Sequence, residues 1–272
     1  MAPILVEGGI LINISINPVL TIGPISVRWY GIMVALAILV LVLWMLWEVR
    51  KGAKLSYDNI LTAALVGIPS GVVISKLLHV VDRWSYYMQN PGEIIGAGGL
   101  TIYGAILGAA LAIWVYSRFS RRFQFGYFAD RVALGLILAQ VIGRVGCTIN
   151  GCCYGIETLL PWGIVYAHPD SYAPLGIAVH PTQIYEIIFL LIVFAVLISL
   201  RWRFKPDGSL FLIYLSLYSL WRVGIDFLRE GTPFLFGLHQ AQVTGLIILA
   251  IAVSILAYRT RWVRVEAVMG EK

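Results

Sequence analysis

The segment GRVGCTINGCCYG, residues 143–155, directly follows a long apolar stretch and contains one arginine, one asparagine and all three cysteines of the chain. The arginine is Arg144. A guanidinium group is planar and donates paired hydrogen bonds, so it binds two oxygens of a phosphate particularly well. Near an apolar stretch long enough to lie in a membrane, the abundant phosphates are those of phospholipid head groups. Arg144 is therefore a candidate for binding the phosphate of a lipid.

A second charged group interrupts a later apolar stretch, where Arg222, Asp226 and Arg229 follow one another at spacings of four and three residues. These spacings place the three side chains on one face of a helix. One interpretation is a buried ion pair between Arg222 and Asp226 that only fixes helix packing. The other is binding of an anion. We favour the anion because the apolar stretches contain several cations and essentially one acidic residue.

The composition shows which solvent these stretches face. Of the 272 residues, 60% are hydrophobic and 12% are charged, about half the charged share of soluble domains. A chain of this length cannot hide so much apolar surface from water, so lipid must be its solvent. Seven apolar stretches are long enough to cross a ~30 Å hydrocarbon layer as helices. They are residues 29–49, 59–80, 100–117, 127–143, 183–200, 210–228 and 240–258. We predict an all-α integral membrane protein with seven transmembrane helices.

Basic residues distinguish the two ends of the predicted helices. Three of them follow each of the first, third, fifth and seventh stretches, whereas the other connections contain little beyond Arg83 and Arg229. By the positive-inside rule, the N-terminus lies outside and the C-terminus lies in the cytoplasm. Because the basic residues are dispersed over four loops, they form no stripe for nucleic acid, and we expect no such partner.

The chain is predicted to form a single polytopic membrane domain over residues 1–272. Residues 1–28 are expected to lie along the outer membrane interface. Residues 81–99 and 145–182 are expected to form enlarged loops on the outer face. Because enlarged loops usually carry function, the outer face is the predicted working face.

The third apolar stretch begins with glycines and a tyrosine. Gly98, Gly99 and Gly104 permit close approach of a backbone to a substrate, and small residues spaced by four also let helices pack closely. Tyr103 is a candidate because a phenol one turn into an apolar helix needs a hydrogen-bond partner.

The fifth stretch is preceded by the segment HPTQIYE, which offers His180 and Gln183 as polar groups at its mouth. An alternative explanation is helix capping, with Thr182 as the N-cap and Glu186 in the first turn.

Three cysteines, Cys147, Cys152 and Cys153, precede His180 at a spacing that matches no common zinc pattern. We favour small thiols that pack a tight turn over a soft-metal site or a covalent thiol intermediate. No metal and no organic cofactor is expected.

Five motifs, in this order along nearly the whole chain, resemble the prolipoprotein diacylglyceryl transferase family of bacteria. They are IGPISVRWYG (22–31), GGLTIYGAILG (98–108), GRVGCTINGCCYG (143–155), HPTQIYE (180–186) and WRVGIDFLRE (221–230). The family residues that the resemblance carries over are Tyr30, Arg144, Asn150, Gly155, Arg222, Asp226 and Arg229. The chain departs from many members at four positions, with Lys76 in place of arginine, Tyr103 in place of histidine, Cys147 in place of asparagine and Cys152 in place of glutamate.

The resemblance implies a multi-pass enzyme of the bacterial plasma (inner) membrane whose active face is outward. It transfers the diacylglyceryl group of phosphatidylglycerol to the lipobox cysteine of a preprolipoprotein signal peptide, among membrane lipids, forming a thioether and releasing glycerol phosphate. We expect Arg144 and Arg222 to stabilise the leaving phosphate and Tyr103 to take the thiol proton, with His180 in reserve. The residues expected to orient the head group and hold the arginines are Tyr30, Asn150, Gln183 and Asp226.

Other functions are also compatible with these residues. A related lipid-modifying transferase would use another donor or acceptor. A lipid or anion transporter would also carry charges inside its helices, but it predicts access from both faces, whereas here the polar residues gather near one side. A retinal photoreceptor is excluded because the last apolar stretch contains no lysine.

Overall fold

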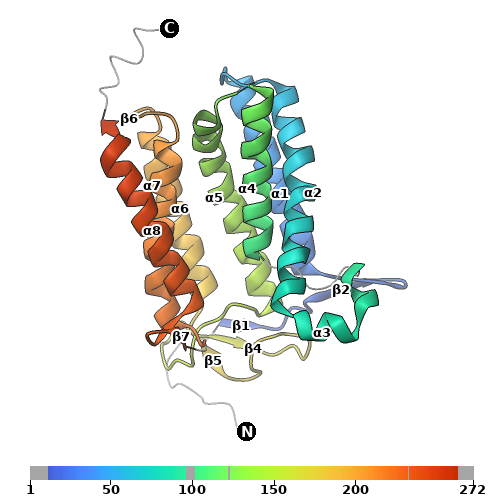
Figure 1. Ribbon diagram of the computed structural model, residues 1–272. Coiled ribbons are helices and arrows are strands. Elements are labelled where there is room, and N and C mark those ends of the chain that lie inside the picture. Colours follow the sequence, from blue (N-terminus) through green and yellow to red (C-terminus); the bar gives the residue numbers. More distant parts are fainter. Residues whose placement is uncertain (1–11, 96–101, 122, 232, 263–272) are drawn as a thin grey trace. The chain divides into compact units, whose positions relative to one another are not determined.

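The computed structural model describes residues 12–95, 102–121, 123–231 and 233–262, and these are mostly helical (Figure 1). The helices are α1 (Trp29–Arg50), α2 (Tyr57–Asp82), α3 (Trp84–Gln89), α4 (Ile102–Ser120), α5 (Phe125–Asn150), α6 (Thr182–Leu200), α7 (Ser209–Ile225) and α8 (Gln240–Arg259), with 3₁₀ turns η1 (Pro91–Ile95) and η2 (Asp226–Leu228). The strands are β1 (Ile12–Ile14), β2 (Val19–Ile22), β3 (Ile25–Arg28), β4 (Ile164–Tyr166), β5 (Ala178–Val179), β6 (Phe204–Lys205), β7 (Pro233–Leu235), β8 (Leu238–His239) and β9 (Arg261–Trp262).

All seven predicted transmembrane stretches coincide with helices. Six are long and apolar enough to cross a membrane, namely α1, α2, α5, α6, α8 and α7 extended by η2. The described apolar part of α4, Gly104–Ser120, is shorter. Large apolar side chains on these helices face outward, since Leu39 of α1, Leu65 of α2 and Ile192 of α6 are more than half exposed. Such surfaces are suited to lipid, and the chain is a multi-pass membrane protein.

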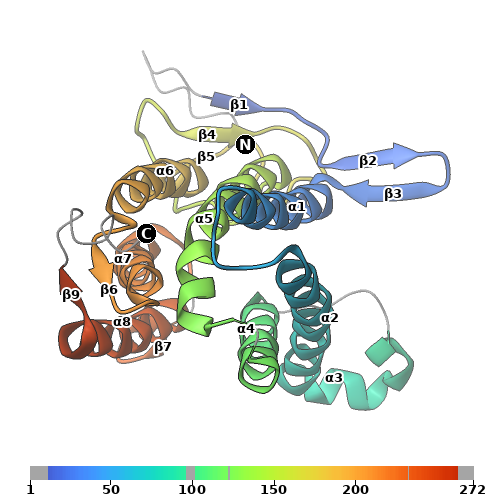
Figure 2. The same cartoon turned by 90° about the horizontal axis from the view of Figure 1, so that it is seen from above.

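The helices group into two compact units, Met1–Leu43 with Ala129–Lys272 and Trp44–Phe128. In the second unit α2 and α4 run side by side (Figures 1 and 2). A Cβ atom on Gly108 of α4 would lie 2.6 Å from the Cβ of Ile74, and one on Gly71 of α2 would lie 2.8 Å from the carbonyl oxygen of Ala105. Close packing through small residues, one interpretation of the third apolar stretch, is therefore confirmed at Gly108.

In the first unit α7 and α8 run side by side, and short strands lie beyond the helix ends (Figure 1). At one end β1 pairs in parallel with β4, and β4 pairs antiparallel with β5. The buried side chains of Ile164, Tyr166 and Val179 form a small core under this sheet. The β7–β8 hairpin lies at the same end, whereas β6 and β9 pair at the opposite end.

Two boundaries differ from the sequence-based expectations. The fourth stretch was predicted to end at Gly143, but α5 continues through Asn150, so Arg144 and Cys147 are helical. Glycine and polar residues in its last turns masked this continuation. The described part of the predicted interfacial segment forms β1 and the β2–β3 hairpin, in which Val19 lies opposite Arg28. This hairpin projects from the start of α1 (Figure 2).

Candidate active site

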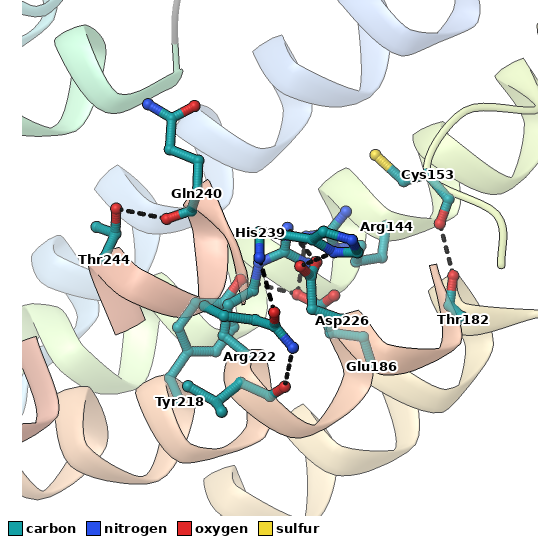
Figure 3. A network of polar contacts seen from close by, with 12 residues as sticks. Arg144, Cys153, Thr182, Glu186, Tyr218, Arg222, Asp226, His239, Gln240 and Thr244 are labelled. Atoms are coloured by element: carbon teal, nitrogen blue, oxygen red, sulfur yellow. Dashed lines mark hydrogen bonds and ion pairs between the residues drawn. The ribbon is translucent and has the colours of Figure 1, made fainter. Parts of the chain in front are cut away.

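Arg144 is held by a carboxylate from the neighbouring helix α6 (Figure 3). Its Nη2 lies 2.9 Å from Glu186 Oε1, and the side chain of Glu186 is 3% exposed. The hydroxyl of Tyr218 on α7 donates to the same carboxylate oxygen at 2.9 Å. Arg144 stands near the end of α5 and Glu186 one turn into α6, so chain direction brings both to one end of the unit. The carboxylate thus joins three helices.

Arg222 is paired within its own segment of chain. Its Nη2 lies 3.2 Å from Asp226 Oδ1, four residues further on. The other oxygen of Asp226 lies 2.9 Å from His239 Nδ1. His239 is the N-cap of α8, and its backbone N–H donates to Gln242 Oε1 at 2.8 Å. Figure 3 shows this chain of contacts from Arg222 to the start of α8.

These pairs correct the charge argument drawn from the sequence. Counting essentially one acidic residue within the apolar stretches left an excess of cations without partners, but this count was wrong, because the stretches contain Glu48, Asp130 and Glu186 besides Asp226. The structure gives each arginine a buried carboxylate, because Glu186 lies inside α6 rather than in a capping turn. The predicted Arg222–Asp226 ion pair is confirmed. Anion binding therefore depends on the donors that the pairs leave open and not on an excess of charge.

One such donor is Nη1 of Arg222. It is buried and has no hydrogen-bond partner among the described residues. The same is true of Nε1 of the adjacent Trp221 and of Oε1 of Gln183. An unpaired buried donor costs about 1–3 kcal/mol. A ligand with acceptor oxygens would relieve this cost at Arg222. The second guanidinium nitrogen of Arg144, Nη1, lies 3.8 Å from the Cys147 sulfur, a weak acceptor that a stronger one can replace.

The segment HPTQIYE fastens the loop that follows α5. Thr182 Oγ1 donates to the carbonyl of Cys153 at 2.6 Å, and Gln183 Nε2 donates to the carbonyl of Cys152 at 2.8 Å. Capping of the helix by Thr182 is wrong, because Pro181 occupies the N-cap position of α6. Gln183 is buried behind this loop. Burial of Tyr166, which lies 3.4 Å from Gln183 Nε2, raises the pKa of its phenol.

Gly155 allows three segments to cross. A Cβ there would collide with the carbonyl oxygen of Leu228 and would lie 2.7 Å from the Cβ of His180. Its backbone N–H donates to the carbonyl of His180 at 2.9 Å. The His180 ring lies 3.4 Å from the Tyr185 hydroxyl, and burial lowers the pKa of the ring, which favours its neutral form. Gly155 is therefore a close-packing position, and its part in binding a substrate stays a prediction.

Asn150 is occupied by a partner that the sequence did not single out. Its side-chain oxygen accepts a hydrogen bond from Arg28 Nη1 at 3.1 Å, and the Arg28 guanidinium lies 4.3 Å from the centre of the Tyr172 ring. Tyr30, two residues after Arg28 in the sequence, is half-buried in the first turn of α1. Arg28 belongs to the motif IGPISVRWYG. A positive charge directly before a membrane helix could have identified Arg28 as a candidate from the sequence.

The remaining predicted residues are placed less completely. Arg229 directly follows η2. The pKa of the Cys153 thiol is lowered, first by hydrogen bonds with Cys147 and Cys152 and to a smaller extent by the positive charges of Arg229 and Arg144. Gly98 and Gly99 lie outside the described residues. Tyr103 belongs to the first turn of α4, but its side chain lies outside the described part of the chain, and its role stays a prediction. Gly104 is buried on the same helix of the second unit.

The three cysteines meet in space. Their sulfur atoms lie within 4.8 Å of one another. Cys147 is buried, whereas Cys152 and Cys153 are half-buried. The sequence spacing, which fits no common metal pattern, did not indicate this arrangement.

Comparison with known proteins supplies the family. The model of the family described as prolipoprotein diacylglyceryl transferase matches residues 17–258. A phosphatidylglycerol–prolipoprotein diacylglyceryl transferase of Dehalococcoides mccartyi is 51% identical over 252 residues, which cover 92% of this chain and 96% of the relative. Proteins of the same name from Clostridioides difficile and Trichormus variabilis are each 37% identical, over 84% and 89% of this chain and over 88% and 89% of the relatives. The chain therefore belongs to the prolipoprotein diacylglyceryl transferase family.

Proposed function

We propose that the protein transfers the diacylglyceryl group of phosphatidylglycerol to the lipobox cysteine of a prolipoprotein signal peptide. Family membership supports this reaction and these two substrates. The observation that carries the assignment to a site is Arg222, a half-buried side chain oriented by Asp226 whose buried Nη1 has no partner among the described residues. A phosphate oxygen is the acceptor that best matches this donor.

In the reaction the thiol sulfur attacks the CH2 carbon that carries the phosphate. A carbon–sulfur bond forms, the carbon–oxygen bond breaks, and glycerol phosphate leaves with the bonding electron pair. Negative charge therefore increases on the phosphate in the transition state. Donors that are already oriented in an environment of low dielectric constant stabilise such charge effectively.

The two ion pairs are suited to provide this stabilisation. Glu186 and Asp226 each occupy one guanidinium nitrogen and thereby fix the plane of Arg144 and Arg222. The Nη1 atoms remain for the phosphate. Binding of the phosphate replaces the weak sulfur contact of Arg144 and satisfies the open donor of Arg222, so both gains arise when the lipid occupies the site.

The thiol must also lose its proton, from an ordinary pKa near 8.5. We assign this step to Tyr103, with His180 as the reserve base. Burial lowers the pKa of His180 and keeps its ring neutral, so the ring is available to accept a proton. Tyr30, Asn150, Gln183 and Arg229 complete the proposed surroundings of the head group.

We propose that this end of the helices faces outward from the plasma (inner) membrane of a bacterium. Arg144 and Arg222 lie near the ends of α5 and α7 that approach the β1–β4–β5 sheet, whereas Arg201, Arg203 and Arg259 lie at the opposite ends of α6 and α8. The positive-inside rule assigns the opposite end to the cytoplasm. Under this proposal the N-terminus lies outside and the C-terminus lies inside, and the chain forms one polytopic domain.

The direct test uses the purified protein in lipid–detergent micelles with phosphatidylglycerol labelled in its acyl chains and a lipobox peptide. We expect a labelled peptide whose mass and resistance to hydroxylamine identify a thioether. A peptide with serine in place of the lipobox cysteine is the control and should remain unlabelled. Turnover with phosphatidylethanolamine alone would assign another donor. Vesicle transport without labelled peptide would contradict the transferase.

A further inference from the structure

The three thiols form a compact group beside Arg144. Cys147, Cys152 and Cys153 are all the cysteines of the chain, and among the described residues their sulfurs form a group within 4.8 Å. Three thiolates around one metal at about 2.3 Å would be separated by about 4 Å. The sulfurs therefore need to move by less than about 1 Å to bind one ion together.

The backbone around the thiols is held in place. The backbone N–H of Cys152 donates to the carbonyl of Cys147 at 3.1 Å, while Gln183 and Thr182 bind the carbonyls of Cys152 and Cys153. Cys153 has a φ angle of +64°, a left-handed conformation that glycine or asparagine adopts more readily. This strain is accepted at a position that directs a third sulfur toward the other two.

The donor set favours a soft ion of low coordination number. Zn²⁺ in structural sites takes four ligands, and the group contains three. Thiolates select Cu(I), which does not require a fourth ligand. Three thiolates with Cu(I) carry a net charge of −2. The charge of Arg144 is paired with Glu186, but its Nη1 lies 3.8 Å from the Cys147 sulfur and can donate to a thiolate there. Arg229 is a second cation whose positive charge acts on this group.

We propose that Cys147, Cys152 and Cys153 bind one Cu(I) ion as a three-thiolate site next to Arg144. Binding forms three copper–sulfur bonds and releases the thiol protons to water, without a change in oxidation state. The site does not depend on the transferase reaction, so its test does not require the lipid substrates.

The test titrates the full-length protein with Cu(I) under anaerobic conditions against a chromogenic Cu(I) chelator. We expect one ion per chain with three sulfur neighbours in X-ray absorption. Single changes of each cysteine to serine should weaken binding by about 100-fold or more. Met33 of α1 packs against Gly146, the neighbour of Cys147 in the sequence. Met33→Leu removes a thioether sulfur and leaves the three thiols intact, so it is the matched control and should bind as the wild type does.

Cys153→Gly separates loss of a ligand from loss of folding. Glycine suits the left-handed backbone at this position, so this variant should unfold at the same or a higher temperature while losing the same affinity for Cu(I). Stoichiometric binding in Cys153→Gly would overturn the proposal, as would preference for Zn²⁺ over Cu(I) in the wild type. If protein purified without reductant contains a disulfide between two of these cysteines, failure of that protein to bind Cu(I) after the disulfide is reduced would also overturn the proposal.

Discussion

The two arginine pairs differ in how the fold supports them. Arg144 of α5 pairs with Glu186 of α6, and Tyr218 of α7 binds the same carboxylate, so this pair joins three helices. Arg222 pairs with Asp226 four residues away, and in the described part of the chain only His239 extends this contact to another helix. The first pair therefore combines helix association with orientation of a guanidinium. The second orients a guanidinium locally and leaves Nη1 without a partner among the described residues.

The largest effect is expected on catalysis from Arg222→Ala. Loss of one donor to developing charge typically lowers kcat by about 10²–10³-fold, and the local pair should make the loss of stability small. The measurement is kcat with labelled phosphatidylglycerol and lipobox peptide, together with the unfolding temperature. Arg222→Lys keeps the positive charge but lacks the planar pair of donors, so its kcat should lie between that of the wild type and that of Arg222→Ala. A kcat for Arg222→Ala equal to that of the wild type would remove the phosphate role.

The largest effect on stability is expected from Glu186→Gln. This change leaves the guanidinium of Arg144 without its carboxylate in a buried site, which costs about 3 kcal/mol. Asp226→Asn should cost less, because its pair joins neighbouring residues of one segment. Denaturant unfolding of both variants in the same micelles gives the comparison. Equal losses of unfolding free energy in the two variants would show that an ion pair between separate helices stabilises the fold no more than a local one.

His239→Ala tests the only described contact that links the second pair to another helix. The change removes the N-cap of α8 and one partner of Asp226, so we expect a loss of about 1 kcal/mol with a several-fold lower kcat. His239→Asn is the matched control, since asparagine is a good N-cap. It should restore the stability and not the kcat. If His239→Asn recovers the kcat as well as the stability, the role of His239 is limited to capping α8.

Tyr218→Phe should give the smallest effect. It removes one hydrogen bond to Glu186 while the ion pair with Arg144 remains, for a loss of about 1 kcal/mol. Tyr214→Phe is the control, because Tyr214 lies beside Tyr218 but its hydroxyl donates to Gln140 at 2.7 Å and to neither carboxylate of the two pairs. If kcat falls in Tyr214→Phe as much as in Tyr218→Phe, the effect belongs to helix packing.

Much of the helical arrangement was predictable. Hydropathy located the six helices that are long and apolar enough to cross a membrane, and it also located α4, because a membrane-spanning helix must satisfy its backbone internally and present apolar side chains over its whole length. Arg144 and Arg222 were recognisable because charge is costly in such helices. Glu186, the partner of Arg144, was missed. An acidic residue near the start of a helix resembles a capping residue until its spatial neighbour is known. His239 gave no signal, because it lies in a short hairpin outside the apolar stretches.

The amino-acid order by itself determined the membrane class, the apolar helices and the two arginines, because hydropathy and the i, i+4 relation act over a few neighbouring residues. The folded chain decided the partners. Arg144 meets Glu186 across 42 residues, and Cys153 meets Thr182 across 29. Such contacts depend on where helices end and cross. A helix that continues seven residues beyond its predicted end changes which side chains face one another, as α5 does in bringing Cys147 to the other two thiols.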